Sequence, residues 1–237
     1  MQAQKQSGFT LVEIAIVLVI IGLLLGGILK GQELINSARV RNLADTTTGI
    51  QAAYYGFIDR YRRVPGDWAA AAAQEAIGVT INGGGNDNGR LDDAQGSFTE
   101  NNAMWEQLAK SGFIQGNFEG GTDEPDTNND LAPLNAYNNI IVMGRTDDYL
   151  GTASRRLNTV FGRGVPVNVM RELDVKLDDG KPEEGDVRAT KVTPSWFAGT
   201  NEWGGSDGTA ACTIVAGGKT IWNVAGDAQD CNAVYLY

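Results

Sequence analysis

The chain has 237 residues, with 29 acidic and 19 basic side chains, two cysteines and no histidine. Histidine is the commonest general base and transition-metal ligand, so its absence excludes Ser-His-Asp and Cys-His catalysis and argues against most familiar enzyme classes. The negative charge is concentrated in residues 64–237, which hold twenty-five acidic and twelve basic residues. Such an acidic region argues against direct binding of nucleic acid, which needs clustered Lys and Arg.

One long apolar run dominates the N-terminal part of the chain. Of the 21 residues from Phe9 to Leu29, fifteen are Val, Ile, Leu or Phe, and the only charged residue is Glu13. A helix of this length spans about 31 Å, which is one crossing of a lipid bilayer. The run is therefore predicted to insert into a membrane, with Glu13 near one end, where a charge costs less than at the centre.

The residues in front of the run form a signal. A polar leader ends at Gly8 and is followed by Phe9-Thr10-Leu11-Val12-Glu13. Gly8 is the small residue that offers a cleavage point, and it precedes the apolar run. A cut after Gly8 would therefore leave the helix in the mature chain. This arrangement resembles the class III signal of type IV pilins and of the pseudopilins of type II secretion. The resemblance covers about residues 1–61.

The resemblance implies how the chain is processed and assembled. A membrane prepilin peptidase would cut between Gly8 and Phe9, and the new amine of Phe9 would be methylated. The subunit would first lie in the bacterial inner membrane with its head in the periplasm. Assembly machinery in that membrane would then polymerise it with copies of itself, through the N-terminal helix, into an extracellular pilus or a periplasmic pseudopilus.

Glu13 has a structural and a functional interpretation. It is either a carboxylate tolerated near the lipid headgroups or a buried charge that needs a partner. We expect no partner within one turn of its own helix, which favours the functional interpretation. The resemblance implies that Glu13 neutralises the Phe9 amine of a neighbouring subunit and so sets the axial register of a filament.

Beyond the apolar run the helix is predicted to continue as an amphipathic segment over residues 30–63. The apolar or partly apolar residues spaced by threes and fours are Val40, Leu43, Thr47, Ile50, Tyr54, Phe57 and Tyr61. The helix should end near Arg63, because Val64 precedes Pro65 and a residue before proline disfavours the helical conformation. Four glycines within Gly22–Gly31 fit either local melting or close helix packing, and the sequence leaves that choice open.

The sequence thus divides into a leader (1–8), a transmembrane or filament-core helix (9–29), an amphipathic half (30–63) and a globular head (64–237). The head is predicted to be α+β, with an antiparallel sheet packed on the amphipathic half as in the type IV pilin fold. Its expected helices are a short one between Asp67 and Gly78, one opened by a capping box at Ser97–Glu100, and one over Val165–Lys176. The expected strands are Asn138–Met143, Asp186–Val192, Thr209–Val215, Thr220–Val224 and Asn232–Tyr237.

The two cysteines, Cys212 and Cys231, lie near the C-terminus of the chain. In an exported domain a disulfide is favoured over free thiols or a metal site. Pilins of the kind that this chain resembles carry such a C-terminal disulfide loop.

Two acidic loops contain oxygen ligands of the type that calcium prefers. The side chains in question are Asn86, Asp87, Asn88 and Asp92 in one loop and Asp126, Asn128 and Asp130 in the other. Both loops resemble part of an EF-hand, and neither completes it. In the loop that starts at Asp126, Leu131 stands in place of the turn glycine and Tyr137 in place of the closing glutamate. Solvated turns explain the same residues, so calcium is a hypothesis and the sequence predicts no other cofactor.

The sequence as a whole predicts a non-enzymatic structural subunit of a type IV pilus. Three alternatives stay open. The first is a pseudopilin of a type II secretion system, and the second is a membrane-anchored protein whose head binds a ligand without polymerising. The third is an exported hydrolase that uses the paired carboxylates of Asp178 and Asp179, although adjacent acidic residues before a glycine are more typical of a turn.

Overall fold

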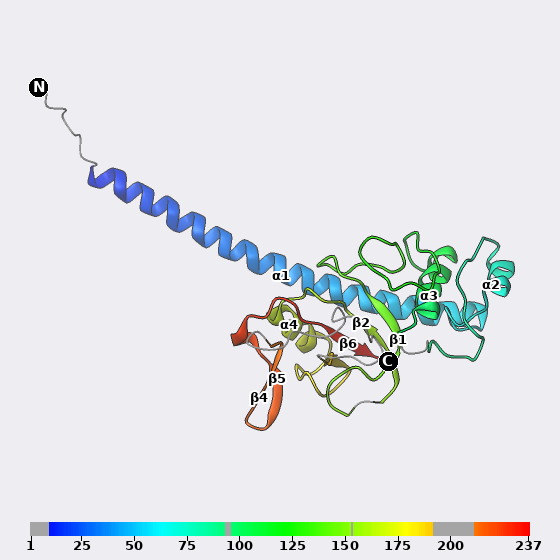
Figure 1. Cartoon of the computed structure of the whole chain (residues 1–237). Coiled ribbons are helices and arrows are strands. Elements are labelled where there is room, and N and C mark those ends of the chain that lie inside the picture. The colour runs from blue at the N-terminus through cyan, green and yellow to red at the C-terminus, as the bar shows by residue number, and fades with distance from the viewer. Residues whose placement is uncertain (1–9, 93–95, 153, 192–210) are drawn as a thin grey trace, which may run out of the picture. The chain divides into compact units, whose positions relative to one another are not determined.

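The structure is a computed structural model that describes residues 10–92, 96–152, 154–191 and 211–237. Its helices are α1 (Leu11–Tyr61), α2 (Ala70–Ile77), α3 (Thr99–Lys110), α4 (Val167–Leu177) and the 3-10 helix η2 (Val224–Gly226). Its strands are β1 (Val142–Thr146), β2 (Arg156–Val160), β3 (Val187–Ala189), β4 (Thr213–Ala216), β5 (Lys219–Trp222) and β6 (Ala233–Leu236). This combination of a long helix with antiparallel strands confirms the predicted α+β pilin fold (Figure 1).

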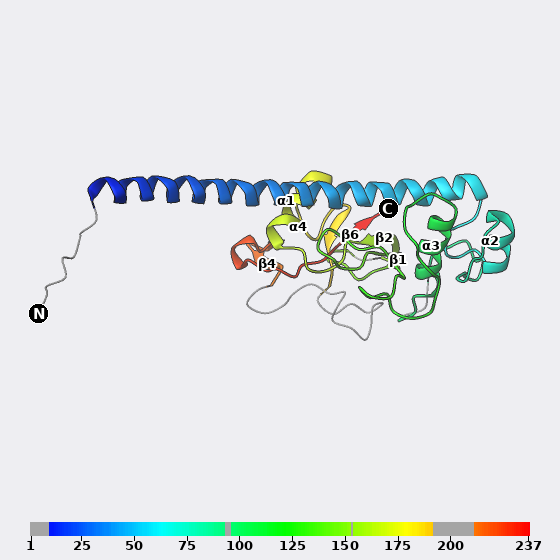
Figure 2. The same cartoon turned by 90° about the horizontal axis from the view of Figure 1, so that it is seen from above.

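Helix α1 is uninterrupted and stays helical through Gly22–Gly31. The chain divides into two compact units at Arg39 and Val40, inside this helix. Every buried residue of α1 lies in the second unit: Val40, Leu43, Ala44, Thr47, Ile50, Ala53, Tyr54 and Phe57. They follow the predicted spacing of threes and fours, and Figure 2 shows this part of α1 running alongside the sheet. The helix ends at Tyr61 because Arg62 adopts a left-handed conformation, with φ of 56°.

Four strands form one antiparallel sheet in the order β1-β2-β6-β3. Strands β3 and β6 lie within predicted ranges, although residue 192 of one range is outside the described residues. The first predicted strand, Asn138–Met143, is misplaced: β1 starts at Val142, and Ile140 forms only an isolated bridge with Leu134. Strand β2 was not predicted, yet it occupies a central position between β1 and β6.

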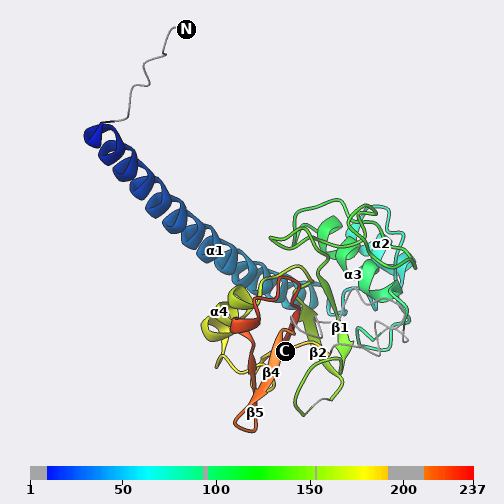
Figure 3. The same ribbon diagram turned by 60° about the vertical axis from the view of Figure 1, so that its left-hand side comes forward.

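Strands β4 and β5 form a separate hairpin that pairs Ala216 with Lys219. Its two turn residues, Gly217 and Gly218, have φ of 59° and 77°, as the favoured two-residue hairpin turn requires. The two strands overlap the predicted strands Thr209–Val215 and Thr220–Val224, but their pairing as a hairpin was not predicted. Thr209 lies outside the described residues, and Val224 belongs to η2 and not to β5. Figure 3 shows the hairpin projecting from the head near α4.

The head contains two clusters of buried apolar side chains. The first gathers around Phe57 of α1 and Trp105 of α3, and the second gathers Val40 and Leu43 of α1 with the inner face of α4. Burial of a large apolar side chain contributes about 1.5–3 kcal/mol. From Val40 onward, α1 therefore contributes to both clusters and belongs to the same compact unit as the rest of the head.

The short helices form as predicted, but their predicted N-terminal caps do not. Helix α2 ends at Gly78 in the left-handed conformation, whereas its N-cap is Ala69 and not Asp67. Helix α3 starts at Thr99 with Phe98 as its N-cap and no capping side chain, so the capping box from Ser97 is wrong. The acidic residues of both predicted caps bind distant loops instead, because those loops present backbone N–H groups that have no strand or helix partner.

Candidate functional site

The first candidate site is the N-terminal turn of α1, which contains Glu13. Thr10 donates two hydrogen bonds to Glu13 Oε2, from its backbone nitrogen (2.8 Å) and from Oγ1 (2.9 Å). The Glu13 nitrogen donates in return to Thr10 Oγ1 at 3.2 Å. This reciprocal arrangement is a capping box. The expectation that Glu13 lacks a partner on its own helix is therefore wrong.

The capping box leaves part of the Glu13 carboxylate available. Both bonds from Thr10 end on Oε2, so Oε1 keeps its capacity to accept a hydrogen bond from another group. Gly8 and Phe9, the predicted cleavage site, lie outside the described residues. Cleavage and methylation at these two residues stay predictions.

An apolar surface follows Glu13 along α1. All fourteen Val, Ile and Leu side chains between Leu11 and Leu29 are exposed, with exposed fractions from 45% to 90%. Among the described residues, α1 is the one helix long and apolar enough to cross a membrane. Exposed apolar surface of this extent marks contact with a membrane or with other protein chains.

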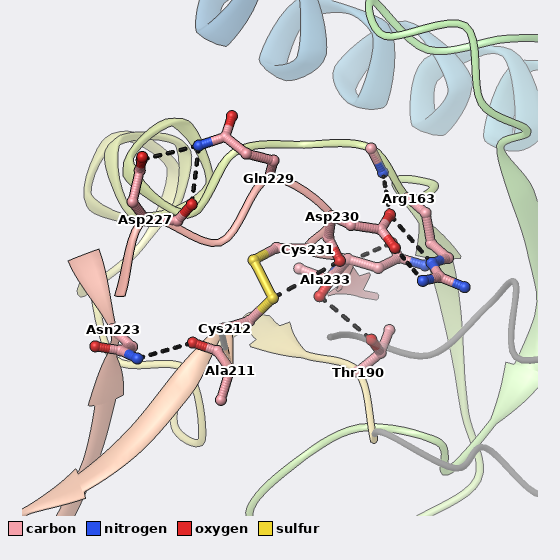
Figure 4. The surroundings of a disulfide bond; sticks show 12 residues. Arg163, Thr190, Ala211, Cys212, Asn223, Asp227, Gln229, Asp230, Cys231 and Ala233 are labelled. Atoms are coloured by element: carbon pink, nitrogen blue, oxygen red, sulfur yellow. Dashed lines mark hydrogen bonds and ion pairs between the residues drawn. A yellow bond between two sulfur atoms is a disulfide. The ribbon is translucent and has the colours of Figure 1, made fainter. Parts of the chain in front are cut away.

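The second candidate site is the C-terminal disulfide. Cys212 and Cys231 form the predicted bond, with their Cα atoms 5.7 Å apart, and both residues are buried. Cys231 is also hydrogen-bonded to Val165 just before α4, and the carbonyl of Cys212 accepts a bond from Asn223 just after β5. The disulfide therefore joins the start of the β4–β5 hairpin to the segment that leads into β6 (Figure 4).

Beside the disulfide, Arg163 and Asp230 form a two-pronged ion pair (Figure 4). They line a polar groove of about 560 Å³ together with Asp126, Asn128 and Asn139. Part of the second predicted calcium loop therefore shares this groove with the Arg163–Asp230 ion pair, in which a carboxylate already balances the guanidinium charge. The Asp126 carboxylate accepts a bond from the Asn128 nitrogen, as in an ordinary Asx turn.

The first predicted calcium loop is held by buried carboxylates that lie elsewhere in the chain. Asn86 donates to Glu100, and the backbone nitrogens of Asn88 and Gly89 donate to Asp67. Within the loop, Asn88 donates to Asp92 at 2.9 Å, and Asp87 lies 3.8 Å from Arg63. In the second loop, Asp130 has φ of 51°, which is typical of a turn. Calcium binding by either loop stays a prediction.

Helix α3 supplies buried polar side chains that the sequence analysis did not identify. Glu106 is fully buried and accepts bonds from the backbone nitrogens of Asn82, Gly83 and Gly120. Gln107 is equally buried and bonds Gly66 and Trp68. Trp105 of the same helix is also fully buried. No local sequence pattern signals the polar contacts, because their partners lie 14 to 41 residues away.

Three acidic residues gather at the C-terminal end of α4. Oxygen atoms of Asp174, Asp178 and Asp179 lie within 4.8 Å of one another, which is the one such cluster in the described part of the chain. Burial raises the pKa of Asp174 to about 6, against the effect of its hydrogen bonds from Trp222 and Gly180. Asp178 caps the end of α4 and Asp179 bonds Lys181, so these two residues form a turn, as the structural interpretation predicted.

Comparison with known proteins bears on the N-terminal segment. Residues 3–29 match the family model of the prokaryotic N-terminal methylation motif. No curated protein and no solved structure matches the chain. The matched residues contain the predicted signal and most of the exposed apolar surface, and the fold adds the long helix, the antiparallel sheet and the disulfide. The chain therefore carries the N-terminal methylation motif and the fold of type IV pilins and pseudopilins.

Proposed function

We propose that this chain is the structural subunit of a type IV pilus and that it polymerises through the N-terminal part of α1. The observation that carries the proposal is the methylation motif followed directly by a helix whose large apolar side chains are all exposed as far as Leu29. Fourteen such side chains need a lipid bilayer or a bundle of identical helices to cover them. A subunit that passes from membrane to filament uses both environments in turn.

Glu13 supports the polymer over a simple membrane anchor. A carboxylate inside a bundle of apolar helices needs a compensating charge, and the chain has no other charged residue between Lys5 and Lys30. The methylated amine of Phe9 in a neighbouring subunit meets this need. Thr10 already satisfies Oε2, which holds the carboxylate at the start of the helix with Oε1 available for the incoming amine.

The test compares Glu13→Ala with Thr10→Val in cells that otherwise form fibres. Glu13→Ala removes the charge, so filaments should be lost or rare, since an unpaired amine in an apolar core costs several kcal/mol at every subunit. Membrane insertion and cleavage should survive. Thr10→Val removes the hydroxyl of the capping box and keeps the charge, so fibres should still form.

Electron microscopy of sheared fibres counts the filaments, and mass spectrometry of their subunits shows whether the chain begins at a methylated Phe9. Glu13→Gln separates the effect of charge from that of shape. If Thr10→Val abolished fibres as completely as Glu13→Ala, Glu13 would act as a helix cap and not as a charge partner. Normal fibres in Glu13→Ala cells would contradict the proposed assembly. Fibres confined to the periplasm would favour a secretion pseudopilin.

A further inference from the structure

Two Asn-Gly and two Asp-Gly pairs occur in the sequence: Asn82-Gly83, Asn88-Gly89, Asp179-Gly180 and Asp207-Gly208. The last pair lies outside the described residues. In such pairs the glycine nitrogen can attack the side-chain carbonyl carbon of the preceding residue, because glycine has no side chain to hinder the approach. The three described pairs all have an exposed first residue, which water can reach.

The fold demands glycine in each pair, so a substitution of the glycine is not a way to remove the vulnerable sequence. A Cβ atom at residue 83 would lie 2.7 Å from the Cα of Gly120. Gly89 and Gly180 have φ of 84° and 77°, in the left-handed region that other residues rarely adopt. Protection of these sites must therefore come from their surroundings.

The same contact recurs at all three glycines. The Gly83 nitrogen donates to Glu106 Oε2 at 2.6 Å, the Gly89 nitrogen to Asp67 Oδ2 at 2.8 Å, and the Gly180 nitrogen to Asp174 Oδ1 at 3.1 Å. Each acceptor belongs to a buried residue, with an exposed fraction of 2% or less. Each acceptor also comes from outside the turn that it contacts, at sequence separations of 23, 22 and 6 residues.

These carboxylates oppose the chemistry of attack. For deamidation the glycine nitrogen must lose its proton and form a bond to Cγ of the asparagine, ammonia then leaves, and water opens the resulting succinimide to aspartate or isoaspartate. A carboxylate bonded to the N–H group stabilises the protonated amide, because that bond is lost when the proton leaves. The negative charges of Asp67 and Asp174 also disfavour an amide anion beside them, whereas Lys110 lies 2.5 Å from Glu106 and compensates its charge. The bond also restricts the movement that the nitrogen needs to reach the preceding side chain.

We propose that Asn82 and Asn88 are latent deamidation sites, and that the buried carboxylates of Glu106 and Asp67 respectively keep them closed. Asp174 restrains the equivalent isomerisation of Asp179. Each deamidation would add a negative charge to an already acidic head. The chemistry depends only on the head and holds whether or not the subunit polymerises.

The two sites allow a crossed experiment on the full-length chain in detergent, because tryptic cleavage yields both asparagines in one peptide, residues 64–90. Wild type, Asp67→Asn and Glu106→Gln are incubated at mildly alkaline pH, and peptide fragmentation gives the deamidation rate at each asparagine. Asp67→Asn should raise the rate at Asn88 about tenfold and leave Asn82 unchanged. Glu106→Gln should do the reverse.

A matched control is Asp87→Asn, which removes an exposed carboxylate from the same loop; no bond joins that carboxylate to either glycine nitrogen. It should change neither rate. Glu106 accepts hydrogen bonds from several segments, so Glu106→Gln can loosen the whole head. The deamidation rate at Asn88 in this variant shows whether that has happened. Equal acceleration at both asparagines in both variants would overturn the proposal, as would wild-type rates that match those of the denatured chain.

Discussion

Between Leu11 and Leu29, α1 exposes every large apolar side chain, whereas from Val40 onward it buries those spaced by threes and fours. Both stretches are regular α-helix, so backbone conformation does not distinguish them. The difference lies in how apolar residues are distributed around the helix: on all sides in the first stretch and along one stripe in the second. A helix that is apolar on all sides needs an environment that the chain alone cannot supply.

The two stretches of α1 therefore have different roles. The second stretch belongs to the head and its stability comes from packing inside this chain. The first stretch exposes its apolar side chains, and a helix of this kind needs lipid or other protein chains to cover them. Substitutions in the two stretches should therefore affect different measurements, folding stability in one case and insertion or assembly in the other.

The largest expected effect on stability comes from Phe57→Ala. Phe57 is fully buried and its ring lies 4.7 Å from that of Tyr61 and 5.9 Å from that of Phe113. Removing it should destabilise the head by about 3–5 kcal/mol. Leu18→Ala is the matched control in the exposed stretch and should change the unfolding free energy by less than about 0.5 kcal/mol. Thermal melting of the full-length chain in detergent measures both, and equal losses would contradict the division of α1.

The buried stripe of α1 was predictable from sequence, because the spacing of apolar residues indicates which face of a helix is buried. The strand β2 was not. Its residues Asn158 and Thr159 are polar and fully buried, and Asn158 is bonded to Thr146 of β1. Polar residues in sequence are more typical of a loop than of a central strand. The sequence of β2 therefore predicts a loop unless the strand that pairs with it is known.

Among the candidate sites, too, those made by local motifs were predictable and those made by distant residues were not. The N-terminal signal was predictable because Gly8 and Glu13 belong to a local motif. The disulfide was predictable because the chain has only two cysteines. The roles of Asp67 and Glu106 were not, because a buried carboxylate that binds a distant turn leaves no periodic trace. Asp67 was predicted to cap the nearest helix, whereas in the structure it accepts a hydrogen bond from the nitrogen of Gly89, 22 residues away.

The second largest effect should come from the disulfide. Replacing both Cys212 and Cys231 by Ser should destabilise the head by about 3 kcal/mol, since the bond closes a loop of 19 residues. Membrane insertion should be unaffected because it depends on the first stretch of α1. Melting of the double variant should match that of reduced wild type. An unchanged melting temperature would show that the second apolar cluster holds the C-terminal segment without the bond.

A smaller effect should appear as a pH dependence that arises from Asp174. Burial, with the nearby charges of Asp179 and Asp178, raises its pKa to about 6, while its bonds from Trp222 and Gly180 act in the opposite direction. The folded chain then binds the proton more tightly than the unfolded chain, whose Asp has a pKa of about 4. The contribution of this group to stability should rise as the pH falls through about 6 and level off below about 4.

The measurement is the difference in unfolding free energy between wild type and Asp174→Asn at several pH values. Between about pH 8 and pH 5, wild type should gain about 1.4 kcal/mol relative to the variant. The exposed residue Glu172 on the same helix provides a matched control, since Glu172→Gln should leave the pH profile of wild type unchanged. A constant difference across this range would mean that Asp174 titrates like an ordinary aspartate.

The smallest expected effect is that of calcium on the head. A ligand that binds only the folded state, at a free concentration about five times its dissociation constant, stabilises that state by about 1 kcal/mol. Chelation should therefore lower the melting temperature of the full-length chain slightly, and added calcium should restore it. Asp92→Ala and Asp126→Ala assign the response to one loop, because each removes one carboxylate from one loop only. If neither chelator nor calcium moves the melting curve, both loops are ordinary turns, and the head, like the buried stretch of α1, draws its stability from contacts within the chain.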